Sequence, residues 1–444
     1  MEKPLYIAGL DIGTTKVACI VGERKENGKI NILGYAKTES TGVKHGMVFN
    51  IDETVTAIQR AVEEASNQSG IDIKSVNVGI AGRHIRSLSH HGQMIRETPD
   101  KTICMEELEK MRDAAFKIAI EPGEEIIDVV PQEYIIDNEP DIRNPKGMTG
   151  LQVEANYHVI IARVDSVRNI LTCINKAGLE MEHLILEPIA SARAVIDDDE
   201  REAGVALVDM GGGTTDIAVF HDKILYHTAV IPFAGNVITD DIHKGCSIIK
   251  KQAEAIKVKY GSALASENKS EEFVSIPGIR GSQPKEISLK NLASIIQARM
   301  EEILECVNME VQKVNTTHKL VSGIVLTGGG AMLKHIQQLA SFKTGMSVRI
   351  GYPDEYLSNE NVDELKSPIY STGIGLVLEG IKRYEYELLV NKRQPEIIDE
   401  EEGKETDKEV VTEKAEPKDK NSFIKKLLSR LVRNFSDDID QNIQ

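Results

Sequence analysis

Two short stretches of this sequence are near-copies of each other, and they constrain the fold more than any other feature. The first, DIGTTK, covers residues 11–16, and the second, DMGGGTTD, covers residues 209–216. Each follows an apolar, β-branched run, ends that run with an aspartate, and continues with glycine and two threonines. Their matching settings predict that the chain contains one strand-and-turn unit twice.

The elements around these turns support a duplication. Residues 4–37 contain three strand-like runs, 52–69 carry apolar residues at helical spacing, and 75–82 form a fourth strand pattern. Residues 204–231 again give three strand-like runs, and helical patterns and a strand at 319–329 follow. We therefore predict a duplicated α/β fold with a cleft between the two copies.

Two segments interrupt this plan. Residues 84–164 hold one helical run and two strand-like runs, enough for a small inserted α+β subdomain. Residues from about 236 to 310 are helical and charged, with a loop near 276–283, and suggest a second, smaller insertion. The predicted division is half I at 1–83 and 165–200, the insert at 84–164, half II at 201–390, a linker at 391–420 and a C-terminal helix at 421–435.

Charge and cysteine usage exclude some functions. The net charge of −17 argues against nucleic acid as the main partner, because a phosphate backbone demands a basic face. The five scattered cysteines show no CxxC spacing, which favours reduced thiols in a cytoplasm over a disulfide framework or a zinc site. We expect no signal peptide and no membrane-spanning helix.

The two turns carry the chemistry of an anion site. Glycines let backbone N–H groups approach a phosphate, threonine hydroxyls add donors, and a lysine supplies a point charge. The leading aspartates suit an Mg²⁺ ion held largely through water. Two glycine-rich hairpins of purely structural role are the alternative, which their matching positions make less favoured. The candidate residues are Asp11, Gly13, Thr14, Thr15 and Lys16 in the first turn, and Asp209, Gly211, Gly212, Gly213, Thr214 and Thr215 in the second.

A third glycine-rich turn, LTGGGAML, covers residues 326–333. It follows a strand pattern and is expected to open a helix. Its glycines Gly328, Gly329 and Gly330 would let a flat ring pack on the backbone. This signal is weak alone, since many strand-to-helix turns contain glycine, but it falls in the expected half.

In this order, the motifs resemble the five-part nucleotide signature of the actin, Hsp70 and sugar-kinase superfamily. The two remaining parts are EPIASARAV at 187–195 and STGIGLVL at 371–378. The sequence is more closely similar to the FtsA family of bacterial cell-division proteins. That resemblance rests on AGRHI (81–85), VVPQEYIID (129–137), NPKGMTG (144–150), FAGNVITDDI (233–242), AEAIKVKYG (253–261) and a basic amphipathic segment near the C-terminus.

The resemblance implies an actin-like (RNase H-like) fold that binds ATP with Mg²⁺, the metal lying near Asp11 and Asp209. Glu187 would lie near the water shell of the metal, and Gly235 and Asn236 would border the cleft. Glu254 and Lys257 would contact the ribose or adenine side, although their spacing alone favours an exposed ion pair.

Catalysis is expected to be slow. EPIASARAV lacks the glutamine that orients water in actin, and offers only Ser191 and Glu187. Asp209 is then the candidate for positioning an attacking water, and Asp216 is expected to be structural.

The resemblance also implies partners. The insert would take part in filament contacts and recruit later division proteins, and the upper subdomain would receive the C-terminal tail of the tubulin-like protein FtsZ. Such a protein would self-associate into filaments that tether FtsZ at the division site, on the cytoplasmic face of the membrane.

The C-terminal segment predicts the tether. Residues 396–420 hold eleven acids and five bases with few apolar residues, which is typical of a disordered linker. On a helical wheel, residues 423–435 separate into an apolar arc and a basic or neutral arc. The apolar residues are Phe423, Ile424, Leu427, Leu428, Leu431, Val432 and Phe435, and the basic ones are Lys425, Lys426, Arg430 and Arg433.

Such a helix suits the plane of an anionic membrane, and the alternative is a last helix docked on the protein's own core. One such anchor is marginal, so tails that act together on a filament would bind more firmly.

Other functions remain open at this stage. A small-molecule kinase of the same superfamily would need an acceptor pocket with a base and has no use for the tail. An Hsp70-like chaperone would need a β-rich domain after residue 385, where only linker and helix remain. A pilus- or shape-determining actin homologue is disfavoured by the motifs of the insert.

Overall fold

A computed structural model describes residues 6–25, 28–278, 283–358 and 363–393. It confirms the duplicated α/β fold. Half I is a five-stranded sheet in the order β11-β6-β1-β2-β3, and half II is a five-stranded sheet in the order β18-β17-β12-β13-β14. If the strands of each half are numbered from one to five along the chain, both sheets have the spatial order 5-4-1-2-3. The two halves therefore share one topology.

The strands of half I are β1 (Tyr6–Ile12), β2 (Lys16–Arg24), β3 (Ile30–Glu39), β6 (Ser75–Ile80) and β11 (Glu180–Leu186). Those of half II are β12 (Val205–Met210), β13 (Thr215–His221), β14 (Ile224–Ile231), β17 (Gly323–Thr327) and β18 (Val348–Ile350). The first two strands of each half form an antiparallel hairpin, and the first and fourth pair in parallel. Central strands such as VALVDM are apolar almost throughout because helices cover both faces of the sheet.

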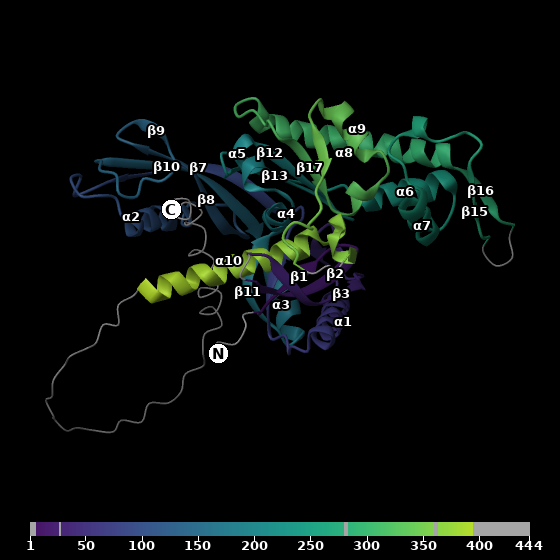
Figure 1. Cartoon of the computed structure of the whole chain (residues 1–444), viewed down its shortest axis with the longest axis horizontal. Coiled ribbons are helices and arrows are strands. Elements are labelled where there is room, and N and C mark those ends of the chain that lie inside the picture. Colours follow the sequence, from purple (N-terminus) through teal and green to yellow (C-terminus); the bar gives the residue numbers. More distant parts are fainter. Residues whose placement is uncertain (1–5, 26–27, 279–282, 359–362, 394–444) are drawn as a thin grey trace, which may run out of the picture.

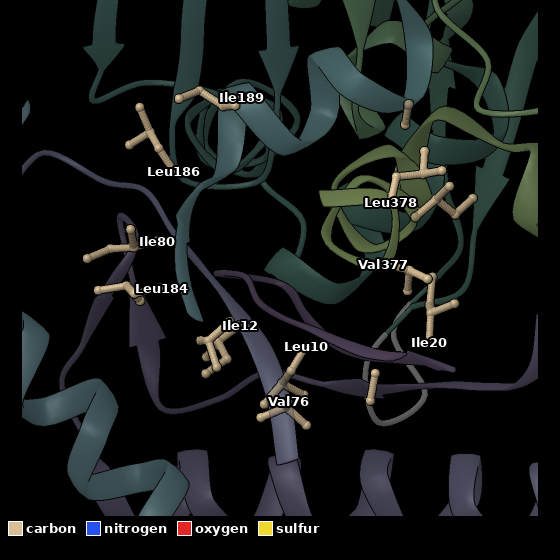
Figure 2. Packing of buried hydrophobic residues seen from close by; sticks show 14 of the residues in the cluster. Leu10, Ile12, Ile20, Val76, Ile80, Leu184, Leu186, Ile189, Val377 and Leu378 are labelled. Carbon is tan, nitrogen blue, oxygen red and sulfur yellow. The ribbon is translucent and has the colours of Figure 1, made fainter. Parts of the chain in front are cut away.

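Four helices cover the sheet of half I: α1 (Ile51–Ser69), α3 (Val164–Lys176), α4 (Glu187–Val195) and α10 (Ser371–Arg393). Asn50 caps the start of α1 by accepting the Glu53 N–H, and Gly70 ends it in the left-handed conformation. Leu10, Ile20 and Val377 lie in the packed layer between sheet and helix (Figure 2). A short hairpin, β4 (Val43–Lys44) and β5 (Met47–Val48), precedes α1.

The position of α10 corrects the predicted domain division. Its sequence was assigned to half II, yet the helix packs on β1, β2, β6 and α4 of half I. Close packing requires glycine here, because a Cβ on Gly375 would lie 1.8 Å from the Ala190 carbonyl oxygen. The helix also runs to Arg393, three residues into the predicted linker.

Outside its sheet, half II consists mainly of helices, and the part from α6 to β16 lies on the side away from the insert (Figure 1). The elements are α5 (Asp198–Ala203), α6 (Gly235–Cys246), α7 (Lys250–Tyr260), the 3₁₀ turn η1 (Ala265–Glu267), β15 (Phe273–Ile276), β16 (Lys285–Ser288), α8 (Leu289–Asn315) and α9 (Ile336–Thr344). The 27-residue α8 runs beneath β13 and β14 and contributes nine buried side chains to the core of this half.

The inserted α+β subdomain is a separate four-stranded sheet, in the order β7-β10-β8-β9, with one helix. Its elements are β7 (Ile85–Ile95), α2 (Met105–Ala115), β8 (Glu124–Ile136), β9 (Glu139–Ile142) and β10 (Gln152–Arg163). The prediction of two strands missed β7 and β9. The run MEELEKMRDAAFKIAI, predicted to be helical over residues 105–120, forms a helix only as far as Ala115. A separate buried cluster around Tyr157 and Val159 forms the core of the subdomain.

The insert packs against half II as well as half I (Figure 1). The Ser87 hydroxyl donates to the Thr228 carbonyl, and the Gln132 side chain donates to carbonyls of β14. Arg143 pairs with Asp222 at 2.7 Å. These contacts fix one side of the insert along β14.

Two further sequence predictions meet the structure only in part. The third glycine-rich turn enters a short 3₁₀ helix, η2 (Gly329–Met332), and α9 begins only at Ile336. The predicted linker beyond Arg393 and the predicted membrane helix 421–435 lie outside the described residues. Among the helices of the described ranges, none combines the length and hydropathy needed to cross a membrane.

Candidate nucleotide site

The two predicted turns are tight hairpins with the same geometry. In the first, Ile12 pairs with Val17 and the Gly13 N–H donates to the Lys16 carbonyl at 2.9 Å. In the second, the Gly211 N–H donates to the Thr214 carbonyl at 3.0 Å, inside a closing pair of Met210 and Thr215.

The tips of the two hairpins face each other. A Cβ on Gly212 would lie 2.3 Å from Thr15 Cγ2, and one on Gly213 would lie 2.6 Å from Thr14 Oγ1. The close approach of the threonines of the first turn therefore explains Gly212 and Gly213 of the second. The structure thus brings both predicted phosphate loops together across the cleft.

Four carboxylates gather beneath these tips. Asp11 is the next-to-last residue of β1 and forms an ion pair with Lys16, and Asp209 is the next-to-last residue of β12. Glu187 is the first residue of α4 and Asp216 is the second residue of β13. The sequence predicted Asp11, Asp209 and Glu187 as neighbours, and assigned Asp216 a structural role.

Burial and the neighbouring negative charges raise the pKa values of Glu187, Asp209 and Asp216. Enclosure by the protein, together with repulsion from Asp11, Asp216 and Asp209, raises the pKa of Glu187 well above its usual value. Burial and the charge of Asp209 raise the pKa of Asp216 to about 7, although a hydrogen bond from Thr214 opposes the shift. Burial also raises the pKa of Asp209, against hydrogen bonds from Ser191 and Thr372. Positive charge in this space would relieve the repulsion.

The donor set fits a divalent cation that keeps most of its water. Within the described ranges, no three ligating side chains converge closely enough to hold a bare metal ion. However, among these residues Asp216 Oδ1 is buried without a hydrogen-bond partner. Mg²⁺ typically retains several waters and takes one or two carboxylates, so Asp11 and Asp209 suit it as ligands or as partners of its waters.

Helices α6 and α7 form the next wall of the site. The Gly235 N–H donates to the Gly211 carbonyl at 3.1 Å, and the Asn236 N–H donates to the Gly212 carbonyl at 2.8 Å. Both residues at the start of α6 are thus fixed to the second phosphate loop. Lys257 donates to the Gly235 carbonyl at 2.9 Å and pairs with Glu254 at 2.7 Å. The Lys257–Glu254 ion pair foreseen from spacing does form, but the lysine is largely buried and joins α7 to the loop.

The three glycines of the third turn differ in how closely other atoms approach them. A Cβ on Gly328, whose φ is +80°, would lie 2.3 Å from Asp209 Oδ1, and one on Gly330 would lie 2.6 Å from Met210 Cβ. Close packing on β12 therefore explains both. A Cβ on Gly329 would meet only Ile369, at 3.8 Å. Of the three glycines, Gly329 therefore has open, exposed backbone on which a flat ring could lie.

Sequence reasoning missed two contributors to the site. Thr372 donates to Asp209 Oδ2 at 3.2 Å beside the Ser191 hydroxyl at 2.7 Å. His45, in the turn between β4 and β5, lies 3.1 Å through Nδ1 from the Gly213 carbonyl. Thr372 belongs to the motif STGIGLVL, but its partner Asp209 is distant in sequence. His45 carried no local signal beyond the glycine that follows it.

The predicted membrane residues lie in the part of the chain that the structure does not describe. They are Phe423, Ile424, Lys425, Lys426, Leu427, Leu428, Arg430, Leu431, Val432, Arg433 and Phe435.

Family models match two parts of the chain. The model described as "Cell division protein FtsA" matches residues 206–375, which cover most of half II and the start of α10. The model described as "SHS2 domain inserted in FTSA" matches residues 82–161, which carry the separate four-stranded sheet.

Curated relatives extend the match over most of the sequence. The chain is 40% identical over 377 residues to Cell division protein FtsA of Pseudomonas aeruginosa, covering 85% of this chain and 89% of that protein. It is 39% identical over 405 residues to Cell division protein FtsA of Neisseria meningitidis serogroup B, covering 90% and 96%. For Cell division protein FtsA of Escherichia coli K12 the identity is 36% over 381 residues, covering 84% and 90%.

A solved structure supports the fold independently of close sequence similarity. A chain of the PilM–PilN type IV pilus biogenesis complex superposes with a TM-score of 0.62 at 17% identity, covering 85% of this chain and 99% of that one. The duplicated sheets and the facing hairpins place the protein in the actin-like structural class. Within that class, the relatives and family models show that the chain belongs to the FtsA family of cell-division proteins.

Proposed function

We propose that this protein binds ATP with Mg²⁺ between its two halves and polymerises in the bound state. The observation that carries the proposal is the pair of facing hairpins above a group of mutually repelling carboxylates, with Lys16 among them. In this proposal the threonines and glycines of both turns hold the phosphates, and Asp11 and Asp209 hold the metal through water. The site has donors for anions directly beside acceptors for a cation, as a metal–triphosphate requires.

The base and the sugar would lie on the half II side. Gly329 offers open backbone, and Gly330 lies next to it in the same turn. Glu254, part-exposed and held by Lys257, would accept hydroxyl donors of a ribose. Asp209, oriented by two hydroxyls, is the group we assign to positioning an attacking water, with Glu187 nearby. Hydrolysis would be slow, with ATP acting chiefly as the ligand that joins the halves.

The cellular role we propose follows from family membership. Filaments of this protein would tether FtsZ filaments to the cytoplasmic face of the membrane at the division site. The upper subdomain, at about 236–310, would receive the FtsZ tail. The insert, at 84–164, would recruit later division proteins and make filament contacts. The basic amphipathic segment 421–435 would hold anionic lipid.

The nucleotide proposal is tested with Asp209→Asn, measured by calorimetric titration of ATP with Mg²⁺. Asparagine keeps the acceptor for Ser191 and Thr372 but removes the charge, so we expect Mg²⁺-dependent affinity to fall at least tenfold with the melting temperature retained. Asp113→Asn, an exposed change on α2, is the matched control and should bind as the original protein does. Equal affinity in both variants would refute the assignment of Asp209.

A small-molecule kinase is the alternative of a different class. It predicts that a phosphorylated small molecule accumulates when the protein is incubated with ATP and a cell extract. Phosphate release without any such product, together with pelleting of ATP-dependent filaments, favours the polymer.

A further inference from the structure

Tyr370 lies outside the predicted nucleotide motifs, directly before STGIGLVL, yet its ring reaches the site. The ammonium of Lys16 lies 5.9 Å from the centre of the Tyr370 ring, and that of Lys37 lies 5.5 Å from it. Both distances fall within the range in which a cation is attracted to an aromatic ring. Tyr370 itself is 1% exposed, so water does not replace these contacts.

The ring is also held by Glu364 and by two residues of β3. The Tyr370 hydroxyl donates to Glu364 at 2.6 Å, and Lys37 donates to the same carboxylate at 2.7 Å. Tyr35 packs edge-on against the ring at 6.3 Å and donates to Glu364 at 3.3 Å. Burial and the neighbouring Glu364 carboxylate raise the pKa of Tyr370 to about 12, so the hydroxyl stays protonated and remains a donor.

The backbone of Tyr370 is tied to the other half of the site. The next residue, Ser371, shares a 2.7 Å hydroxyl contact with Thr327, at the end of β17. The residue after that, Thr372, donates to Asp209. The ring itself packs on β3 of half I, on the same half as Lys16, and the two residues that follow it contact β17 and β12 of half II. Tyr370 therefore lies where the chain joins the Lys16 side of the site to half II.

The chemistry of the two neighbours of Lys16 differs. Asp11 neutralises the ammonium through an ion pair, which weakens it as a partner for phosphate. An aromatic face attracts the ammonium without adding a formal charge, so this contact can hold Lys16 without neutralising it further.

We propose that Tyr370 is a positioning residue, which holds the Lys16 ammonium for the phosphates of the bound nucleotide and couples this position to the closure of half II on half I. The inference rests on the proposed function, because it needs Lys16 to contact a phosphate. It adds a residue, and a connection between the halves, to that site.

The test is a double-mutant cycle on ATP affinity in the full chain, measured by calorimetry with Mg²⁺ present. Tyr370→Leu should weaken ATP binding roughly three- to thirtyfold, the range of one partly buried cation–ring contact. Tyr370→Phe keeps the ring and should change affinity less than about threefold. In a Lys16→Met background, Tyr370→Leu should cause no further loss, which a merely structural effect of the substitution would not reproduce.

Tyr384→Leu is the matched control, since it also removes an aromatic ring but from an exposed position further along α10, away from Lys16. It should leave ATP affinity unchanged. If Tyr370→Leu lowers the melting temperature too far, Tyr370→Met, a non-aromatic side chain of flexible shape, replaces it in the cycle. An equal loss with and without Lys16, or no loss at all, overturns the role of Tyr370. Failure of the original protein to bind ATP, or no effect of Lys16→Met, instead overturns the nucleotide proposal itself.

Discussion

At the scale of single residues, the site depends on contacts between distant parts of the chain: Thr372 donates to Asp209, and His45 lies against the Gly213 carbonyl. Asp11, Lys16, Asp209 and the paired threonines could be chosen because aspartate, glycine and threonine recur in one order at two strand ends. The partners Thr372 and His45 could not, because they reach the site only when distant segments fold together. No local pattern reports such a contact.

Asp216 gives a prediction at this scale. Its pKa is about 7 in the folded chain against an ordinary value of 3.8, so between about pH 4 and 7 the folded state keeps a proton that the unfolded state releases. Stability should therefore fall as pH rises through this window, by up to about 1.4 kcal/mol per pH unit for this group.

Asp216→Asn retains an acceptor for Thr214 and removes the titration. Without nucleotide or Mg²⁺, we expect its denaturation midpoint to decline less between pH 4 and 7 than that of the original protein. Parallel declines in urea denaturation at several pH values would contradict the assigned shift.

At the scale of elements, strands with strong alternation or unbroken apolar runs and capped helices were foreseen, and two kinds of element were not. The edge strand β7 is half-buried or exposed along most of its length, so histidines, serines and an arginine are tolerated in it. Its sequence therefore resembles that of a loop. For α10 the helix itself was consistent with the sequence, but not its partner. A helix pattern shows that one face is buried and not which sheet covers it.

The crossing of α10 and α4 gives the second prediction. Since a Cβ on Gly375 would meet the Ala190 carbonyl at 1.8 Å, Gly375→Ala must separate two backbones, and we expect a loss of roughly 2–3 kcal/mol or more. Gly373→Ala, in the same helix, meets only the end of the Ile20 side chain, at 2.8 Å, and gains helix propensity. It should be near neutral. Thermal and urea denaturation of the pair measure the difference, and similar values for both would show that the helices can move apart freely.

At the scale of the whole molecule, residues 394–420 separate the proposed membrane segment 421–435 from the body along the sequence. The chain leaves the described structure at Arg393, where α10 points away from half II toward the side that carries the insert (Figure 1). Four basic residues near anionic lipid contribute roughly 1 kcal/mol each, and ordering the helix opposes much of the gain from its apolar face. We therefore expect one tail to bind the membrane weakly. Many tails on one filament should bind it more tightly, with an apparent affinity higher by a factor of ~10²–10⁴.

The last prediction tests this arrangement on liposomes of anionic lipid. Leu427→Glu with Leu431→Glu places two charges in the predicted apolar arc, and should release the protein from the vesicles while ATP binding and melting temperature stay as they were. Lys425→Ala with Arg430→Ala should weaken binding less and reduce its dependence on salt, because only screened attraction is removed. A variant with an intact tail that cannot polymerise should also bind more weakly, since avidity is lost. If instead the segment docks on the body, the double glutamate variant will melt at a lower temperature and pellet with vesicles as before.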